Sequence, residues 1–542
     1  MATHESRFLR DQSAPTSSIT QDETSASVVS DSVMLPIMDM KPHTSAHATA
    51  DDDVLVEQSN WMRWYLGAPG TVLGTVVGIV LVVVLKQVPV IYDMTEENSD
   101  FAEYFHGVGV LYFRALTCVT IPLAFINVAM CVSDMVASKM KRKLQLLLLT
   151  TFTTACALAQ GLFWCYLFTG SFDSDGYMAP LANTSAVMAF QCPSLSGDAS
   201  PATLRQDVAT GALVCGSAND TNRTTEIFSF KDFPFSARST GPRLLSFPST
   251  IDEIKYMVNL VVPNNMASML MENNVMGVVT VAIMFGIACG LTSRKDRDNR
   301  LEDILREFHA IFKTMLSYVI AVTPVAIIPL IAAPLLAHTH TVSADTPRLA
   351  AFLGTFLLAA TGHCVIVLPL VLLVCTGTNP MRYMALMKEA LVYGFSCSSS
   401  SKSVPVATRS MDGLAGNRNV ARFAASIGTC INKSGGALYV CMALIWTFHN
   451  AGLGDQLTFV RLGVVSAVSL VASLAIPPVR TGGVAIVVSL FTFLSGVPIT
   501  YSYSFLLVAE CILDPLATVI NLWGNVLVAR IISFNSVSSS RS

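Results

Sequence analysis

Long apolar segments separated by short polar ones run through most of this chain. A helix that crosses the hydrocarbon core of a bilayer needs about 20 mainly apolar residues. Eight segments of about this length are predicted to span a membrane, at residues 66–85, 107–132, 144–168, 273–290, 312–336, 349–375, 423–448 and 505–532. The pattern therefore predicts an all-α polytopic membrane protein.

Two further segments combine apolar residues with strong helix breakers. The first, before span seven, breaks at the serine tract 398–401, and the second, at 464–497, breaks at the prolines of 476–478 and the glycines of 481–483. Span seven is also interrupted, at 432–436. Broken backbone at membrane depth is tolerated only where it is buried in protein or lines a cavity. We therefore predict two re-entrant hairpins, the first from the cytoplasm and the second from outside, with a substrate site between them.

Basic residues in the short loops around 139–143 and 294–300 predict that these loops are cytoplasmic. The N-terminus is then cytoplasmic as well, and because no cleaved-signal pattern precedes the first span, we expect insertion to rely on that span. The loop at 170–255 is then exofacial. It carries three N-glycosylation patterns and two cysteines that could pair in an oxidising compartment: Asn183, Asn219, Asn222, Cys192 and Cys215. The plasma membrane or another membrane of the secretory pathway is expected.

Domain boundaries follow the same changes in composition. Residues 1–60 are predicted to be a disordered cytoplasmic tail, either inert or regulated by phosphorylation, and 533–542 a short cytoplasmic tail. Residues 61–532 form the predicted transporter domain, whose transport core with both hairpins is 385–532.

Charged residues make up 13% of the chain, about half the share of a soluble domain. The net charge of −3 and the lack of a basic face argue against nucleic acid. His338 and His340 are predicted to lie in a solvated loop, and the alternative is a metal site. We expect no enzyme activity, because no nucleophile–base pair or metal motif stands out, and no cofactor beyond a coupled Na⁺ or H⁺.

Polar residues recur along one face of the last predicted span. Asp514, Thr518, Asn521 and Asn525 are spaced by four, three and four residues. A carboxylate inside a span costs at least ~2.5 kcal/mol and normally faces a bundle interior or a water-filled cavity. The stripe fits a ligand-facing surface in which Asp514 pairs with an ammonium or metal cation, or hydrogen bonds between helices. Glu510, one turn earlier, has a structural or a proton-linked role.

Four stretches of the chain resemble the dicarboxylate/amino acid:cation symporter family, which includes the glutamate and neutral amino-acid transporters. They are NPMRY (379–383), SSSSKSVPV (398–406), RNVARFAASIGTCINKSGGALY (418–439) and ILDPLATVINLWGN (512–525). The resemblance implies a homotrimer in which each subunit carries eight spans and two hairpins. It also implies an elevator mechanism, in which spans three and six to eight and both hairpins move against a scaffold of the other spans.

The same resemblance assigns roles to individual positions. Asp514 matches the carboxylate that takes the substrate ammonium. The implied substrate-binding residues are Ser399, Ser400, Ser401, Gly436, Asp514, Thr518 and Asn521. The implied cation-binding positions, or their replacements, are Gly428, Asn432, Lys433, Ser434, Asn521 and Asn525.

Departures from the family pattern concern the second carboxylate of an acidic substrate. Ala517 stands where acidic-substrate members have an arginine, and Gly436 stands where they have a threonine. A second carboxylate would lose its bidentate partner, which favours a neutral amino acid over a dicarboxylate. Arg480 either replaces that partner or points to solvent or headgroups.

Cation coupling is also altered. Ser434 and Asn525 stand where the family has sodium-binding aspartates, and Lys433 replaces a methionine. Lys433 either fills the place of a sodium ion or extends away from the site, and Lys402 adds charge at the first hairpin tip. We expect weak or absent sodium dependence, with proton coupling or exchange, although Gly428 and Asn432 could keep one cation site. The alternatives to a transporter are a non-transporting sensor and an anion channel with the same fold.

Overall fold

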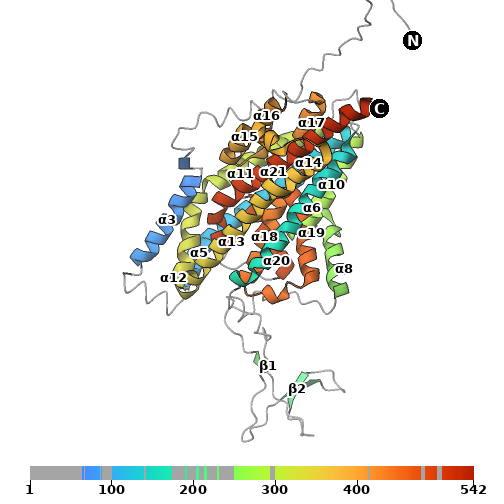
Figure 1. The fold of residues 1–542 in the computed structure, drawn as a ribbon. Coiled ribbons are helices and arrows are strands. Elements are labelled where there is room, and N and C mark those ends of the chain that lie inside the picture. Colours follow the sequence, from blue (N-terminus) through green and yellow to red (C-terminus); the bar gives the residue numbers. More distant parts are fainter. Residues whose placement is uncertain are drawn as a thin grey trace, which may run out of the picture. The chain divides into compact units, whose positions relative to one another are not determined.

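The structure is a computed structural model, which describes the backbone of the following residues: 64–65, 68–85, 87, 100–138, 142–173, 190–191, 203–206, 213–216, 229–230, 250–292, 300–337, 339–412, 416–477, 482–496 and 503–541. The chain divides into two units, of which the second, Ser59–Ser542, contains all of these residues. The predicted tail at 1–60 and the sites Asn183, Asn219, Asn222 and Cys192 lie outside them. Figure 1 shows the helices of the second unit.

Apolar helices occupy the positions that hydropathy predicts for the first four spans. They are α3 (Ala68–Leu85), α5 (Asp100–Ala137), α6 (Lys143–Phe168) and α10 (Val275–Thr292). In the described part of the chain, five helices are long and apolar enough to cross a membrane, and a bent pair makes a possible sixth. The helical, membrane-type fold is therefore confirmed, while the count of eight spans and two hairpins stays a prediction.

Between α6 and α10 the structure has short elements. After the 3₁₀ turn η1 (Thr169–Ser171), strand β1 (Phe190–Gln191) pairs antiparallel with β4 (Ser229–Phe230). Strand β2 (Thr203–Gln206) pairs antiparallel with β3 (Leu213–Gly216). Helices α8 (Thr250–Val261) and α9 (Met266–Met271) then lead into α10.

The segment predicted as span five is bent rather than straight. Helices α11 (Arg300–Ala321) and α12 (Thr323–Ala337) meet at an angle of 50°. Pro324 explains the bend, because proline lacks an amide hydrogen and disfavours helical backbone in the residue before it. Around the bend the backbone makes tighter bonds, from the Val325 N–H to the Val322 carbonyl (3.0 Å) and from the Val322 N–H to the Val319 carbonyl (3.1 Å).

Span six contains a wide turn and begins earlier than predicted. Helix α13 (Thr339–Gly362) passes through the π-turn η2 (His363–Val367) into α14 (Leu368–Thr376). His340 falls in α13, so the loop predicted there is wrong, whereas His338 lies outside the described residues. Hydropathy marks only the apolar part of a helix, and the first turns of α13 are polar.

Each predicted hairpin corresponds to a pair of consecutive helices. The first consists of α15 (Pro380–Cys397) and α16 (Ser400–Met411), and the second of α19 (Phe459–Ala475) and α20 (Gly482–Ser495). Between them lie α17 (Arg418–Ile431), α18 (Ser434–Asn450) and the 3₁₀ turn η3 (Gly454–Gln456). The last helix, α21 (Tyr503–Arg541), continues beyond the predicted boundary at 532.

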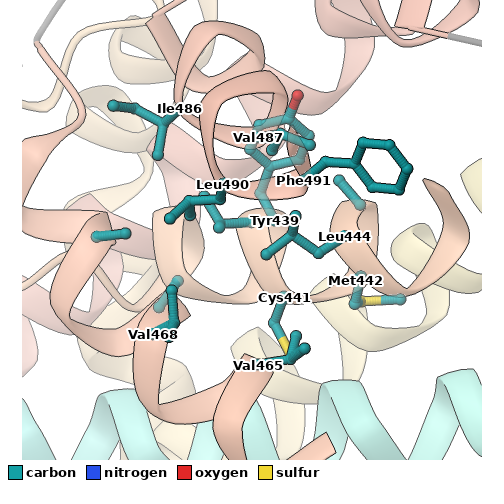
Figure 2. Packing of buried hydrophobic residues seen from close by; sticks show 14 of the residues in the cluster. Tyr439, Cys441, Met442, Leu444, Val465, Val468, Ile486, Val487, Leu490 and Phe491 are labelled. Atoms are coloured by element: carbon teal, nitrogen blue, oxygen red, sulfur yellow. The ribbon is translucent and has the colours of Figure 1, made fainter. Parts of the chain in front are cut away.

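Helix α18 lies at the centre of the largest core. All 17 of its residues are buried, and it packs against α6, α19, α20 and α21. Figure 2 shows side chains of this core around Tyr439, Cys441 and Leu444, with Val465 and Val468 of α19 and Leu490 and Phe491 of α20. This packing holds the break before α18 against the last helix.

Candidate functional site

The tip of the first hairpin is formed by the serine tract. Ser398 has a left-handed backbone (φ 48°), which ends α15. Ser399 then caps α16 by accepting a hydrogen bond from the Lys402 N–H (3.4 Å). Ser399 and Ser400 are buried, whereas Ser401 and Lys402 are exposed. The serines thus break the helix as the sequence predicts, by capping and by a turn.

This tip is held close to α21. An added Cβ at Gly394 would lie 2.9 Å from Leu522 and 3.1 Å from the Ser403 hydroxyl. The Ser403 hydroxyl in turn donates to the Ser399 carbonyl (2.8 Å). The first hairpin therefore packs directly on α21 beside Leu522, which follows Asn521 in the sequence.

Span seven breaks at Asn432 and Lys433. The Asn432 N–H still donates to the Gly428 carbonyl (2.7 Å), and α18 starts only at Ser434. The Asn432 side chain is fully buried, and neither its amide oxygen nor its amide nitrogen has a hydrogen-bond partner in the described part of the chain. The Ser434 hydroxyl is likewise buried without a partner there. Buried polar groups are normally satisfied, so this cluster is a candidate site.

Asn521 bridges the break to α21. Its side-chain oxygen accepts hydrogen bonds from the backbone N–H groups of Gly435 (2.8 Å) and Gly436 (3.3 Å). Such a side chain satisfies amides that the start of a helix leaves without a partner. An added Cβ at Gly435 would lie 2.1 Å from the Ala517 carbonyl oxygen, so only glycine allows this approach.

Asn525 is fixed one turn further along α21. Its amide nitrogen donates to the Ala425 carbonyl (2.6 Å), while its amide oxygen has no partner among the described residues. An added Cβ at Gly428 would lie 1.7 Å from that oxygen. At Gly524, an added Cβ would lie 3.1 Å from the Asn432 amide nitrogen and 3.3 Å from the Ser434 hydroxyl. Four of the predicted cation positions are thus brought together.

Lys433 is buried, with 6% of its surface exposed. It interacts electrostatically with Asp514, Cys430 and Cys131. This burial argues against the alternative in which the side chain extends away to the membrane surface. Lys433 therefore places a buried amino group next to the predicted cation positions.

A second group of polar side chains surrounds the carboxylates of α21. Glu510 is buried, interacts electrostatically with Asp514 and contacts the backbone of Val484 in the second hairpin. The Tyr439 hydroxyl lies beside Glu510 but does not meet hydrogen-bond geometry. Asp514 is half-buried, and Thr518 is buried.

The described end of α19 and start of α20 reach the same region. An added Cβ at Gly436 would lie 3.0 Å from Ile476, and one at Gly483 would lie 3.0 Å from a Glu510 carboxylate oxygen. Arg480 lies outside the described residues. Parts of the chain that are separated by up to about 120 positions thus meet around α18 and α21.

His363 is one polar group that the sequence analysis did not select. It lies at the start of the π-turn η2, is fully buried, and neither ring nitrogen has a hydrogen-bond partner among the described residues. Its only signal in the sequence is a single histidine within an apolar run. The contacts of Tyr439 with Glu510 and of Cys131 with Cys430 were also missed, because no spacing in the sequence reveals them.

A cavity of about 900 Å³ lies between α5, α8, α9, α20 and the start of α21. It is lined by Arg114 and Glu272 among many apolar side chains, and none of the predicted site residues borders it. No group of three or more His, Cys, Asp or Glu within the described ranges is placed to hold a metal ion. The candidate site is thus the polar cluster itself.

A family model of sodium:dicarboxylate symporters matches residues 246–534. Because this covers more than half of the chain, the chain belongs to the sodium:dicarboxylate symporter family, a family of transporters and not of enzymes. The membrane-protein class predicted from hydropathy agrees with this result.

Individual relatives carry transporter names. The chain is 27% identical to human neutral amino acid transporter B(0) over 264 residues, which cover 48% of this chain and 47% of the relative. It is 29% identical to an excitatory amino acid transporter of Onchocerca volvulus over 265 residues (48% and 51%). It is 26% identical to human excitatory amino acid transporter 1 over 260 residues (48% and 47%). The chain spans about half the length of the curated relatives it matches.

Proposed function

We propose that this protein is a secondary active transporter of small neutral amino acids or related organic anions, working by alternating access as a homotrimer. The observation that carries the proposal is that the break between α17 and α18 lies against the polar face of α21, while α16 and the described ends of α19 and α20 lie against α18 and α21. Relatives named for neutral and for excitatory amino acids support the substrate class.

Substrate is held, in this proposal, between the serine turn and the last helix. Ser399, Ser400 and Ser401 with nearby backbone amides take the α-carboxylate, and Asp514 takes the α-ammonium with Thr518 and Asn521 beside it. Gly436 lies against Ile476, which leaves an apolar surface where acidic-substrate relatives have a threonine. Ala517 supplies no donor for a second carboxylate, so a neutral side chain fits better than an acidic one.

Coupling is proposed to depend on protons or exchange more than on sodium. Ser434 and Asn525 bring no negative charge to the break, and the buried Lys433 brings a positive one. A cation would therefore bind less well than beside two carboxylates. Gly428 and Asn432 still offer oxygens for one residual cation.

Counterflow into proteoliposomes tests the proposal. Purified protein is reconstituted into vesicles that are preloaded with an unlabelled neutral amino acid, acidic amino acid or dicarboxylate. Uptake of the labelled substrate is then measured in sodium, potassium and proton gradients. We expect counterflow with neutral amino acids and equal uptake with and without a sodium gradient. Strict sodium dependence would overturn the coupling scheme.

The same assay separates the alternative functions. A sensor would bind labelled amino acid without accumulating it inside the vesicles, and an anion channel would give a chloride current that needs no substrate. Either result would contradict the transporter proposal.

A further inference from the structure

We infer that Glu510 is the side chain that binds the coupled proton, at the place where the second hairpin meets α18 and α21. The inference rests on the function proposed above, in which protons drive uptake. Glu510 belongs to α21, and 4% of its surface is exposed. A charged carboxylate at this depth is costly unless it is paired, and a bound proton removes the charge.

The Glu510 carboxylate lies against the first turn of α20. An added Cβ at Gly483 would lie 3.0 Å from Glu510 Oε1 and 2.5 Å from a ring carbon of Tyr439. Figure 2 shows Tyr439 together with Val487 of α20 in the same core. Glu510, Tyr439 and the backbone of Gly483 therefore meet at one place, although they belong to three different helices.

Polar atoms of both side chains are left unsatisfied there. In the part of the chain that the structure describes, Glu510 Oε2 and the Tyr439 hydroxyl are buried without a hydrogen-bond partner. Buried polar atoms normally have one. A carboxylate oxygen is only an acceptor, whereas a protonated carboxyl group also offers an O–H donor. The unpartnered Oε2 is therefore the atom at which the proton binds.

The charged surroundings favour Glu510 over Asp514 as the proton site. Among the described residues, the titratable groups that interact with Glu510 are Asp514, one turn later on α21, and Tyr439 of α18. Helices α12 and α20 also pack against α21 and carry no titratable side chain. Arg114 of α5 lines the separate cavity, which Glu510 does not border. Asp514 is half-buried, interacts with Lys433 and is proposed to bind the substrate ammonium.

The step itself is a single protonation. A proton adds to a lone pair of Glu510 Oε2, so one carboxylate and one proton give one carboxylic acid, and the charge of the site rises by one. Packing of α20 over Glu510 keeps water from the carboxylate, so this packed arrangement is favoured when the proton is bound. A substrate that favours the same arrangement binds cooperatively with the proton, because each stabilises the state that the other prefers.

The transport test uses the full-length protein in proteoliposomes, with the labelled amino acid of the panel that gives the strongest counterflow. The membrane potential is held at zero. Coupling to a single proton lets an inward gradient of about one pH unit raise accumulation about tenfold. The readout is the ratio of accumulation with and without this gradient, which does not depend on how much active protein each preparation contains.

Matched variants show whether Glu510 is responsible. We expect a ratio of about ten for the unchanged protein and about one for Glu510→Gln, because an amide cannot take up the proton. Glu510→Asp keeps a carboxyl group and should restore the response to the gradient. Glu389→Gln, which changes an exposed carboxylate of α15, should leave the ratio unchanged.

Infrared difference spectroscopy of the purified protein measures the bound proton without any substrate. A protonated carboxyl group has a C=O stretching band that a carboxylate lacks. Difference spectra between acidic and alkaline pH should therefore contain a band that disappears in Glu510→Gln and remains in Glu389→Gln. This measurement keeps the test valid if Glu510→Gln transports poorly.

Two results would overturn the inference: a Glu510→Gln variant that responds to the proton gradient as the unchanged protein does, or carboxyl bands that this variant leaves unaltered. Counterflow by the unchanged protein without any response to the gradient would also contradict it, and would leave transport itself in place. A protein that carries no substrate of the panel would contradict the proposed function instead. The infrared spectra would still decide whether Glu510 binds a proton.

Discussion

Two neighbouring regions of the site differ in charge. The break region, defined by Gly428, Asn432, Lys433, Ser434 and Asn525, contains a buried lysine and no carboxylate. The carboxylate region, about three to four turns before Asn525 along α21, contains Glu510 and Asp514. Both regions include residues of α21, and the break region also includes residues of α17, of α18 and of the break between them.

The difference indicates how the same fold can lose a site for a metal cation and keep a site for the ammonium group of a substrate. Where sodium-binding members of the family are expected to have acids, this chain has an amide and a hydroxyl, with a lysine ammonium between them. The carboxylates that remain lie where an ammonium group is proposed to bind. The comparison thus predicts that removing charge from the carboxylate region abolishes substrate binding, while adding negative charge to the break region creates cation dependence.

The largest effect is expected from Asp514→Asn. Removing one partner of a buried charge pair costs about 2–5 kcal/mol, because the substrate ammonium is left without its counter-ion. We therefore expect amino-acid counterflow to fall at least about 30-fold. The matched control is Asp455→Asn, which changes an exposed carboxylate in η3 and should leave counterflow unchanged. Normal transport by the Asp514 variant would show that Asp514 does not bind the substrate ammonium.

The double variant Ser434→Asp with Asn525→Asp tests the break region directly. Two carboxylates beside Asn432 should attract a cation and offset the charge of Lys433. We expect a sodium gradient to stimulate uptake by at least about tenfold, or ~1.4 kcal/mol, where the unchanged protein shows no stimulation. The measurement is uptake with and without sodium, and Lys433→Met added to the pair should strengthen the effect. Unchanged sodium dependence in both variants would show that this region does not hold the coupled ion.

A smaller effect, on stability, is expected from Gly428→Ala. The new methyl group would lie 1.7 Å from the Asn525 amide oxygen, so Asn525 or the backbone must move. Overpacking of this kind typically costs about 1–3 kcal/mol, which should appear as a lower unfolding temperature. Gly463→Ala in α19 is the control, because its methyl group meets nothing within 4 Å and should stabilise the helix by about 0.5–1 kcal/mol. A Gly428 variant as stable as this control would contradict the close packing of α17 on α21.

Hydropathy and helix breakers predicted much of this architecture. Span three was expected at 144–168 and is α6 (Lys143–Phe168), and the serine tract breaks the chain at Ser398. These features are local, since a run of apolar side chains or a residue with turn-forming chemistry acts on its own neighbours. The polar stripe of α21 was also visible from its spacing alone.

Contacts between distant segments could not be predicted in the same way. Nothing near Asn525 shows that its oxygen faces Gly428, and nothing near Asn521 shows that it caps Gly435 and Gly436. The bend before Pro324 and the π-turn at His363 were missed because their segments are uniformly apolar. Hydropathy records whether a segment prefers lipid or protein interior but not which neighbour it meets.

An exposed ion pair can be compared with the buried charges of the site, and its removal is expected to have the smallest effect on stability. Arg422 forms a salt bridge with Asp412 at the end of the first hairpin, and this hydrogen-bonded pair lowers the pKa of the Asp412 carboxyl. A carboxyl whose pKa is lower in the folded state stabilises the protein above its unfolded pKa and loses that contribution as the pH falls through the folded pKa. The contribution should therefore be fully present at neutral pH, begin to fall below about pH 4, and disappear only below the lowered folded pKa.

Asp412→Asn tests this expectation through the unfolding temperature measured from neutral to acidic pH. We expect a slightly lower unfolding temperature than that of the unchanged protein at pH 7, because exposed pairs contribute little. The difference should narrow as the pH falls below about 4 and vanish below the folded pKa of Asp412. Arg422→Gln should behave in the same way, and combining both changes should add nothing further. A decrease in unfolding temperature at neutral pH as large as that of Gly428→Ala would contradict this expectation. It would mean that this exposed ion pair contributes as much to stability as the buried packing at Gly428.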